Sequence, residues 1–285
     1  MPIDYETLKN FDIPEVTHEF TRRDTVLYAL SVGLGFDPMD EQQLDFVYER
    51  RLKAMPAMAN VLGYAGFWLA DPRTGVDPVK LVHGEQSLVL HAPLPVEGTV
   101  RAKTRVSGIV DRGAGKGALL YSGRDILAED GTKLATVSGT TFLRGDGGFG
   151  GPAGPVKPPH PTPDRAPDIV VDLPTRPEAA LLYRLNGDLN PLHIDPAVGA
   201  KAGFPRPILH GLCTFGVVAH ALLRACCGYD PAKFEQMDMR FSAPVFPGET
   251  IRTEIFHEAG GAAFRARVVE RDIVVGSNGL FRIRA

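Results

Sequence analysis

A carboxylate, an amide and an imidazole lie within six residues of one another in the segment Asp188-Leu189-Asn190-Pro191-Leu192-His193. On a helix, Asp188 and His193 would not share a face. Pro191 disfavours the helical conformation at Asn190 and favours a turn, so the two side chains can converge from a loop. Together they could orient a water, take a proton from it and return a proton to carbon. The segment therefore predicts an acid/base centre; an ordinary structural turn is the alternative.

A candidate charge-stabilising group is the backbone N–H of Gly211, in the segment Pro207-Ile208-Leu209-His210-Gly211-Leu212. Gly211 opens an apolar stretch that we predict to be a helix. Its N–H would lie at the positive helix end with no side chain between it and a ligand oxygen, which suits an oxyanion. Such a donor lowers the barrier of a reaction that builds negative charge on a carbonyl oxygen. Close packing of the glycine is the alternative.

The elements that must position these groups follow from periodicity. Residues 211–226 are apolar at steps of three and four and nearly all round, which predicts a buried helix. Segments rich in β-branched and aromatic residues, separated by turn signals, predict strands. In the second half they are Met237 to Pro244, Thr250 to His257, Ala262 to Glu270 and Ile273 to Ile283; in the first half they are Leu81 to Ala92, Thr99 to Asp111, Ala118 to Leu127 and Lys133 to Leu143.

The two halves of the chain echo each other. Pro93-Leu94-Pro95-Val96-Glu97-Gly98-Thr99-Val100-Arg101 returns as Pro244-Val245-Phe246-Pro247-Gly248-Glu249-Thr250-Ile251-Arg252, at a constant offset of 151. Between Gly145 and Pro163, twelve of nineteen residues are Gly or Pro, a density typical of an extended linker. We predict an α+β chain with a repeat at 1–144, a linker at 145–167 and a second repeat at 168–285, each repeat a central helix wrapped by an antiparallel sheet.

Composition narrows the class of protein. A formal net charge of -3 argues against a broad nucleic-acid-binding surface, and no apolar run approaches the length of a membrane span. The three cysteines suggest a reducing compartment, so we expect a cytoplasmic protein. The spacing of His193, Asp195 and His210 matches no familiar metal motif, and we predict no metal site. The glycines of residues 113–117 lie between two strand-like runs, which favours a hairpin over a phosphate loop.

From these segments the chain resembles the MaoC-like, or R-specific, enoyl-CoA hydratase 2 family, and it is similar in particular to the hydratase domain of the multifunctional enzyme of peroxisomal β-oxidation. The likeness covers nearly the whole chain, including residues 23–33, 83–86, 147–151 and 240–241. It implies a double hotdog fold. It also implies that Asp188 and His193 hold the water, that Asn190 helps to position it, and that Gly211 binds the thioester oxygen.

The resemblance also implies a coenzyme A path. Its predicted members are His83, Gly84, Arg112, Leu189, Pro191, Leu192 and Phe241. Arg112 replaces a lysine of the relatives and keeps the positive charge that a phosphate requires. The first repeat has no copy of the Asp-x-Asn-Pro-x-His motif, so we expect it to make room for the acyl chain.

The sequence thus predicts a hydro-lyase that reversibly hydrates trans-2-enoyl-CoA to 3-hydroxyacyl-CoA; the R configuration and a homodimer are implied by the resemblance. No redox cofactor is expected, because the coenzyme A thioester is itself the substrate. Three alternatives stay open, of which one is a relative dedicated to a branched or steroid-derived enoyl-CoA, or to dehydrating a hydroxyacyl-CoA in a specialised pathway. A hotdog thioesterase would need a carboxylate on the central helix, and a non-catalytic acyl-CoA-binding subunit would be expected to have lost Asp188 or His193.

Overall fold

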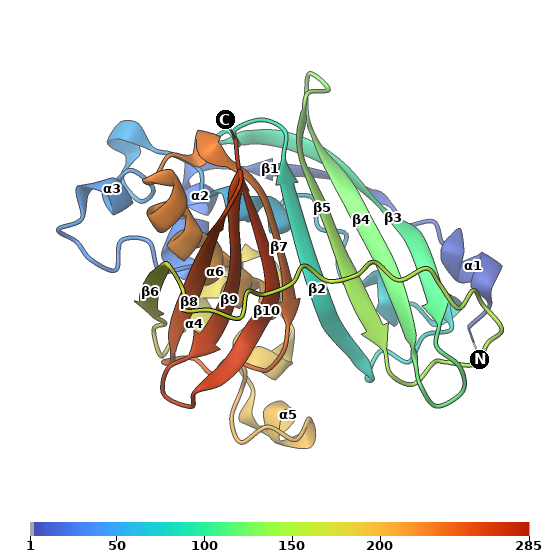
Figure 1. Ribbon diagram of the computed structural model, residues 1–285. Coiled ribbons are helices and arrows are strands. Elements are labelled where there is room, and N and C mark those ends of the chain that lie inside the picture. Colours follow the sequence, from blue (N-terminus) through green and yellow to red (C-terminus); the bar gives the residue numbers. More distant parts are fainter. Residues whose placement is uncertain (1–2, 285) are drawn as a thin grey trace.

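Ten strands form one antiparallel sheet that curves around a long helix in the computed structural model, which describes residues 3–284 (Figure 1). The strand order is β1-β3-β4-β5-β2-β7-β10-β9-β8-β6. The strands are β1 (Glu15–Phe20), β2 (Leu81–Leu90), β3 (Gly98–Asp111), β4 (Ala118–Ala128), β5 (Lys133–Leu143), β6 (Ile169–Pro174), β7 (Phe234–Phe241), β8 (Thr250–Glu258), β9 (Gly261–Val268) and β10 (Ile273–Ile283).

The strand order is symmetric about the contact between β2 and β7. Outward from this seam, β5, β4, β3 and β1 on one side correspond to β10, β9, β8 and β6 on the other. Antiparallel pairs such as Leu88 with Met237 join the two halves into one continuous sheet. The duplicated sequence is therefore a duplicated fold, and the α+β double hotdog prediction is confirmed.

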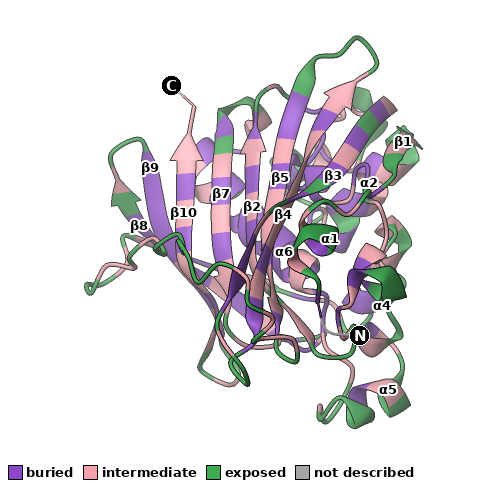
Figure 2. Cartoon of the chain, turned by 90° about the vertical axis from the view of Figure 1, so that its right-hand side faces the viewer, coloured by how far each residue is buried: buried purple, intermediate pink, exposed green. Residues whose placement is uncertain are grey.

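Helix α6 (Gly211–Cys227) lies against the concave face of the second half-sheet. Twelve of its seventeen residues are buried, as expected for a helix that is apolar nearly all round. It ends at Cys227 and is capped by Gly228, whose φ of 59° is the left-handed conformation that glycine adopts at little cost. Buried and partly buried residues alternate along the strands, because one face of the sheet packs inward (Figure 2).

The first repeat departs from the predicted symmetry, because it has no long central helix. The segment that corresponds to α6 at the offset of 151 is residues 60–76, and it forms turns and short 3₁₀ helices. Gly63 and Gly66 have φ values of 60° and 74°, which a helix cannot accommodate. The expectation of a central helix in both copies was therefore wrong for the first copy, where α2 (Arg22–Ser31) is shorter.

The remaining helices are short. They are α1 (Tyr5–Lys9), α3 (Glu41–Leu44), α4 (Ala179–Tyr183) and α5 (Pro196–Lys201), with 3₁₀ helices at Glu49–Arg51, Pro56–Asn60, Trp68–Ala70, Pro72–Thr74, Arg184–Asn186, Pro191–His193 and Pro231–Lys233. Among the helices that residues 3–284 form, none has the length and apolar character that crossing a bilayer requires.

The segment between the repeats has no helix or strand from residue 144 to 168 and crosses the face of the sheet away from α6 (Figure 1). Its start is fixed by the buried carboxylate of Asp111, which accepts hydrogen bonds from the backbone N–H groups of Gly148, Gly150 and Gly151. These bonds help to lower the pKa of Asp111, against the effect of burial. The glycines at residues 113–117 form the predicted turn between β3 and β4.

Candidate active site

The loop that carries Asp188 and His193 is shaped by its own side chains. Asn190 adopts φ −54° and ψ 121°, the extended conformation that the following Pro191 favours. The Asn190 Oδ1 accepts a hydrogen bond from Leu192 N at 3.0 Å, and Asp188 Oδ1 accepts one from Asn190 N at 3.2 Å. These two local turns reverse the chain, so that the carboxylate and the imidazole face one region.

Side-chain atoms of Asp188, His193 and His210 lie within 4.8 Å of one another. The His193 side chain is buried, and its Nδ1 donates to the carbonyl oxygen of Ile208 at 2.9 Å. This bond places the proton of the neutral ring on Nδ1 and leaves Nε2 as an acceptor. Burial lowers the pKa of His193 from its ordinary value. The ring is therefore neutral at physiological pH and able to accept a proton from water.

His210 is a site residue that the sequence prediction considered only as a metal ligand. It is 1 % exposed, and its Nε2 donates to the backbone oxygen of Asp188 at 3.2 Å. Its ring stacks on that of His193, with ring centroids 3.8 Å apart and an interplanar angle of 29°. Burial, with the His193 charge as a smaller cause, lowers its pKa to about 4. His210 thus contacts both members of the predicted pair as a neutral ring.

The stacked histidines bear on the prediction of no metal. Asp188, His193 and His210 each offer one possible ligand atom, and these atoms lie within 4.8 Å of one another. A carboxylate and two imidazoles are also the groups that acid/base chemistry uses. The prediction of no metal therefore stays a prediction.

Gly211 is the first residue of α6, as predicted. The first N–H groups of a helix have no intrahelical acceptor, and within residues 3–284 Gly211 N donates to no other group. Its neighbour is the Phe241 ring, which a Cβ added to the glycine would approach at 3.5 Å. An unpaired donor at the positive end of a helix beside Asp188 and His193 is suited to stabilise an oxyanion.

His83 reaches the same place from the first repeat, across the seam between β2 and β7. Its ring centroid lies 4.8 Å from that of Phe241. His83 Nε2 donates to Gln86 Oε1 at 3.0 Å and to Glu85 O at 3.2 Å. Desolvation lowers the pKa of His83, while the nearby Asp188 charge opposes that effect. The structure therefore brings His83, Phe241 and Gly211 into one contiguous group beside Asp188.

The other predicted residues are less closely connected. Asn190 uses one lone pair of its side-chain oxygen within the loop, and its amide nitrogen has no partner within residues 3–284, so the nitrogen is free to donate to a water. Leu189 is 61 % exposed, as a residue at the mouth of a site would be. Arg112 lies in the exposed turn between β3 and β4, and no hydrogen bond in residues 3–284 joins it to the Asp188 loop. Its part in coenzyme A binding stays a prediction.

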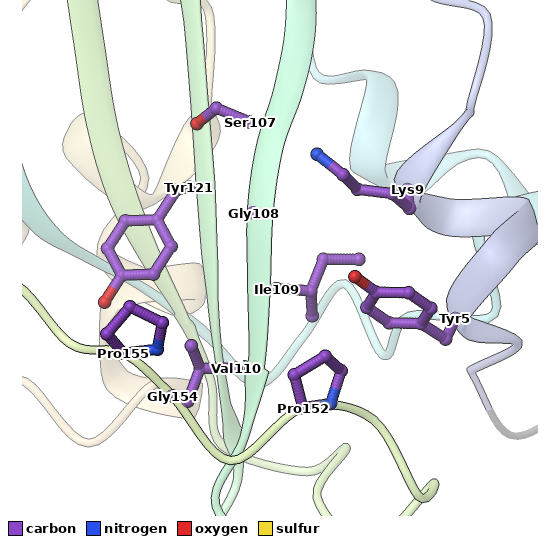
Figure 3. Close-up of a pocket in the computed structure, with 10 residues that line it drawn as sticks. All are labelled: Tyr5, Lys9, Ser107, Gly108, Ile109, Val110, Tyr121, Pro152, Gly154 and Pro155. Atoms are coloured by element: carbon purple, nitrogen blue, oxygen red, sulfur yellow. The ribbon is translucent and has the colours of Figure 1, made fainter.

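A separate pocket of about 300 Å³ lies at the edge of β3, between α1 and the linker (Figure 3). Tyr5 and Lys9 of α1, Tyr121 of β4 and the linker prolines line it, with the Lys9 amine bonded to Val106 O at 3.0 Å. None of the predicted site residues lines this pocket. It is a space beneath the linker rather than part of the candidate active site.

Comparison with known proteins places this arrangement in a family. The MaoC like domain matches residues 159–278, and the MFE-2 hydratase 2 N-terminal domain matches residues 18–145. The 3-hydroxyacyl-thioester dehydratase Y of Mycobacterium tuberculosis is 42 % identical over 89 % of this chain and 88 % of that protein. The peroxisomal enoyl-CoA hydratase 2 of Arabidopsis thaliana is 37 % identical over 92 % of this chain and 90 % of that protein.

Solved structures agree with the sequence relatives. A MaoC-like dehydratase from Phytophthora capsici superposes with a TM-score of 0.86 at 34 % identity, over 98 % of both chains. The peroxisomal multifunctional enzyme type 2 of Drosophila melanogaster gives 0.82 at 34 % identity, over 95 % of this chain and 48 % of that one. The chain belongs to the MaoC-like enoyl-CoA hydratase 2 family.

Proposed function

We propose that this protein reversibly hydrates trans-2-enoyl-CoA to (3R)-3-hydroxyacyl-CoA at the site formed by Asp188, His193 and Gly211. The enzyme is a hydro-lyase, as its relatives named enoyl-CoA hydratase and hydroxyacyl-thioester dehydratase are. The observation that carries the proposal is the convergence of Asp188 and His193 next to the unpaired N–H of Gly211. The R configuration follows the family resemblance.

Each group has a part in the addition of water. Asp188 and His193 hold a water molecule, whose oxygen forms the new bond to C3 of the enoyl group. The pair takes a proton from this water and delivers a proton to C2, so the reaction is balanced without an oxidant or a reductant. The electrons of the double bond shift toward the thioester oxygen during attack, and Gly211 N–H stabilises the resulting negative charge. Asn190 Nδ2 helps to hold the water.

The substrate's thioester would lie between Gly211 and the ring of His83, with Phe241 as the surface beneath it. We further propose that the reaction needs no metal or redox cofactor, since the three groups account for every proton and for the developing charge. A homodimer of the whole chain and a cytoplasmic location complete the proposal; both rest on sequence arguments and family likeness. A role in fatty acid β-oxidation is supported by the multifunctional relatives.

One assay tests the assignment. Loss of the enoyl thioester absorbance is followed with wild type, Asp188→Asn and His193→Ala, on short, medium and long enoyl-CoAs. We expect either substitution to lower turnover by roughly two to four orders of magnitude while the thermal unfolding transition persists. Undiminished activity in both variants would refute the site. Release of free coenzyme A would indicate a thioesterase, although α6 carries no Asp or Glu, and binding without turnover would indicate an acyl-CoA-binding subunit.

A further inference from the structure

The concave face of the first half-sheet is divided by a zone of polar side chains. One apolar cluster includes Leu88, Val137 and Ile126, and a second, separate cluster includes Val106, Leu120 and Leu143. Polar residues lie between the two clusters on the same face of the sheet. We call this zone the polar floor: it consists of Gln86 of β2, Ser122 and Arg124 of β4, and Gly139 of β5, which adds no side chain.

Arg124 is the charged member of the polar floor. Its Nε donates to Leu62 O at 3.1 Å and its Nη2 to Asn60 O at 2.6 Å. A guanidinium has five N–H donors, so three remain, and within residues 3–284 no carboxylate pairs with them. Burial lowers the pKa of Arg124 to about 10. A partly buried cation without a counter-ion is costly unless a ligand completes it.

The polar floor is connected to the candidate active site by hydrogen bonds. His83 donates to Gln86 Oε1, and Gln86 Nε2 donates to Asn60 Oδ1 at 2.8 Å. Asn60 is 2 % exposed, and its Nδ2 is a buried donor with no partner in the described chain. Asn60 in turn is held by Arg124. A continuous polar path therefore leads from the His83 ring at the thioester to the guanidinium of Arg124.

The first repeat covers this path with the short 3₁₀ helix Pro56–Asn60 and the turns that follow it. The segment at residues 60–76 forms turns where the second repeat has α6, so no long helix fills the concave face. Between His83 and Arg124 the floor consists of Gly139 and Ser122, which are small. Tyr64 is 45 % exposed, and the charges of Asp188 and Arg124 both act on its hydroxyl. At the far end of the path, the guanidinium of Arg124 and the unpaired Nδ2 of Asn60 supply donors, and no carboxylate of residues 3–284 pairs with Arg124.

We propose that Arg124, with the Asn60 amide and the Tyr64 hydroxyl, binds a carboxylate at the far end of the acyl group, so that the preferred substrate is a 2-enoyl thioester with a terminal carboxylate. The inference rests on the proposed hydratase function and goes beyond it by naming the acyl class. A carboxylate supplies the missing counter-ion and accepts the N–H donors that remain on the guanidinium. An anionic oxygen could also come from a coenzyme A phosphate, and the experiment separates the two sources.

The test compares matched pairs of trans-2-enoyl-CoA, equal in chain length and ending in either a methyl group or a carboxylate. The variants are Arg124→Met, which keeps length without charge, and Tyr64→Phe. Arg105→Met, at an exposed position on the neighbouring strand β3, is the matched control. The same acyl groups are also assayed as N-acetylcysteamine thioesters, which lack phosphates. Thermal unfolding and the rate on the methyl-ended substrate verify that each variant is folded.

We expect wild type to prefer the carboxylate-ended substrate in kcat/KM, and Arg124→Met to lose about 10- to 100-fold on it, chiefly in KM, the range of one charge-assisted hydrogen-bonding contact. All rates of Arg105→Met should stay within about threefold of wild type, and the loss of Arg124→Met on the methyl-ended substrate should be clearly smaller than its loss on the carboxylate-ended one. Tyr64→Phe should lose less, about three- to tenfold on the carboxylate-ended substrate.

Three outcomes would overturn the proposal. The first is the absence of a carboxylate preference in wild type, and the second is an equal loss of kcat/KM by Arg124→Met on both substrates. The third is a loss by Arg124→Met on every coenzyme A thioester but not on the N-acetylcysteamine thioesters, which would assign Arg124 to a phosphate. Absence of hydration of any enoyl-CoA by wild type is a different result, because it refutes the hydratase function itself.

Discussion

Replacing Gly211 with proline removes the proposed oxyanion donor and should leave the fold unchanged. Proline lacks the N–H, but it is favoured at the first position of a helix, where that N–H has no intrahelical acceptor. The preceding His210 has φ −56° and ψ 135°, the conformation that a following proline requires. A new Cβ would contact the Phe241 ring at 3.5 Å, an ordinary van der Waals distance. Stability should therefore stay within about 1 kcal/mol of wild type.

The catalytic effect should be large by comparison. Removal of one oxyanion donor costs roughly 10²- to 10³-fold in kcat, or about 3 to 4 kcal/mol of transition-state stabilisation. Gly211→Ala is the matched control, because it adds the same Cβ and keeps the N–H. The assay measures kcat on an enoyl-CoA for both variants, beside their thermal unfolding. If Gly211→Pro is folded and turns over within about threefold of Gly211→Ala, Gly211 N–H is not the donor.

Three further predictions concern the histidines. His210→Phe keeps the stack on His193 and removes both the bond to Asp188 O and the unpaired, buried Nδ1. We expect kcat to fall about five- to twentyfold with little change in Tm. An unchanged kcat would show that the bond does not position Asp188. Burial lowers the pKa of His193, so the acid limb of kcat/KM should lie below pH 6.5; a limb above that value would contradict a neutral, buried ring. His210 and His220 each have a pKa of about 4, lowered first by burial. Between pH 6.5 and 4 the unfolded forms of these histidines bind protons that the folded forms do not. The free energy of unfolding should therefore fall by roughly 3 kcal/mol for each histidine as pH falls from 6.5 toward 4. Denaturant titrations across that window measure this loss, and the free energy of unfolding of His210→Phe should depend less steeply on pH.

The sequence was informative where a local pattern determines a structure. The apolar periodicity of residues 211–226 predicted α6, and alternating segments predicted eight of the ten strands. The edge strands β1 and β6 were not predicted, because each is only six residues long and pairs with one neighbour. The missing helix of the first repeat was predictable in principle, since Gly63, Gly66 and Pro72 all disfavour a helix there. The assumed symmetry of the repeats outweighed that local evidence.

His210 and Arg124 could not be assigned from the sequence, because their surroundings come from distant parts of the chain. His210 acquires its role from the ring of His193, which lies 17 positions earlier in the chain and which the Asp188 loop brings back onto His210. Arg124 lies on an ordinary strand pattern, and the groups that bond to its guanidinium, Asn60 O and Leu62 O, come from a distant segment of the chain. Motif spacing predicts groups that meet within one loop, as Asp188 and His193 do, but not groups that meet through tertiary packing.

One extra residue in β2 determines whether the side chain of His83 reaches the candidate active site. Side chains two residues apart on a regular strand point to the same face, so His83 would share the outer face with Glu85, which pairs with Arg240. The register shift between His83 and Glu85 inserts Gly84 as an extra residue. This bulge turns His83 to the concave face, where it bonds to Gln86 and packs on Phe241. A Cβ at Gly84 would lie 3.2 Å from Thr140 O, closer than most Cβ contacts, so glycine suits the bulge through which the first repeat contributes His83 to the site.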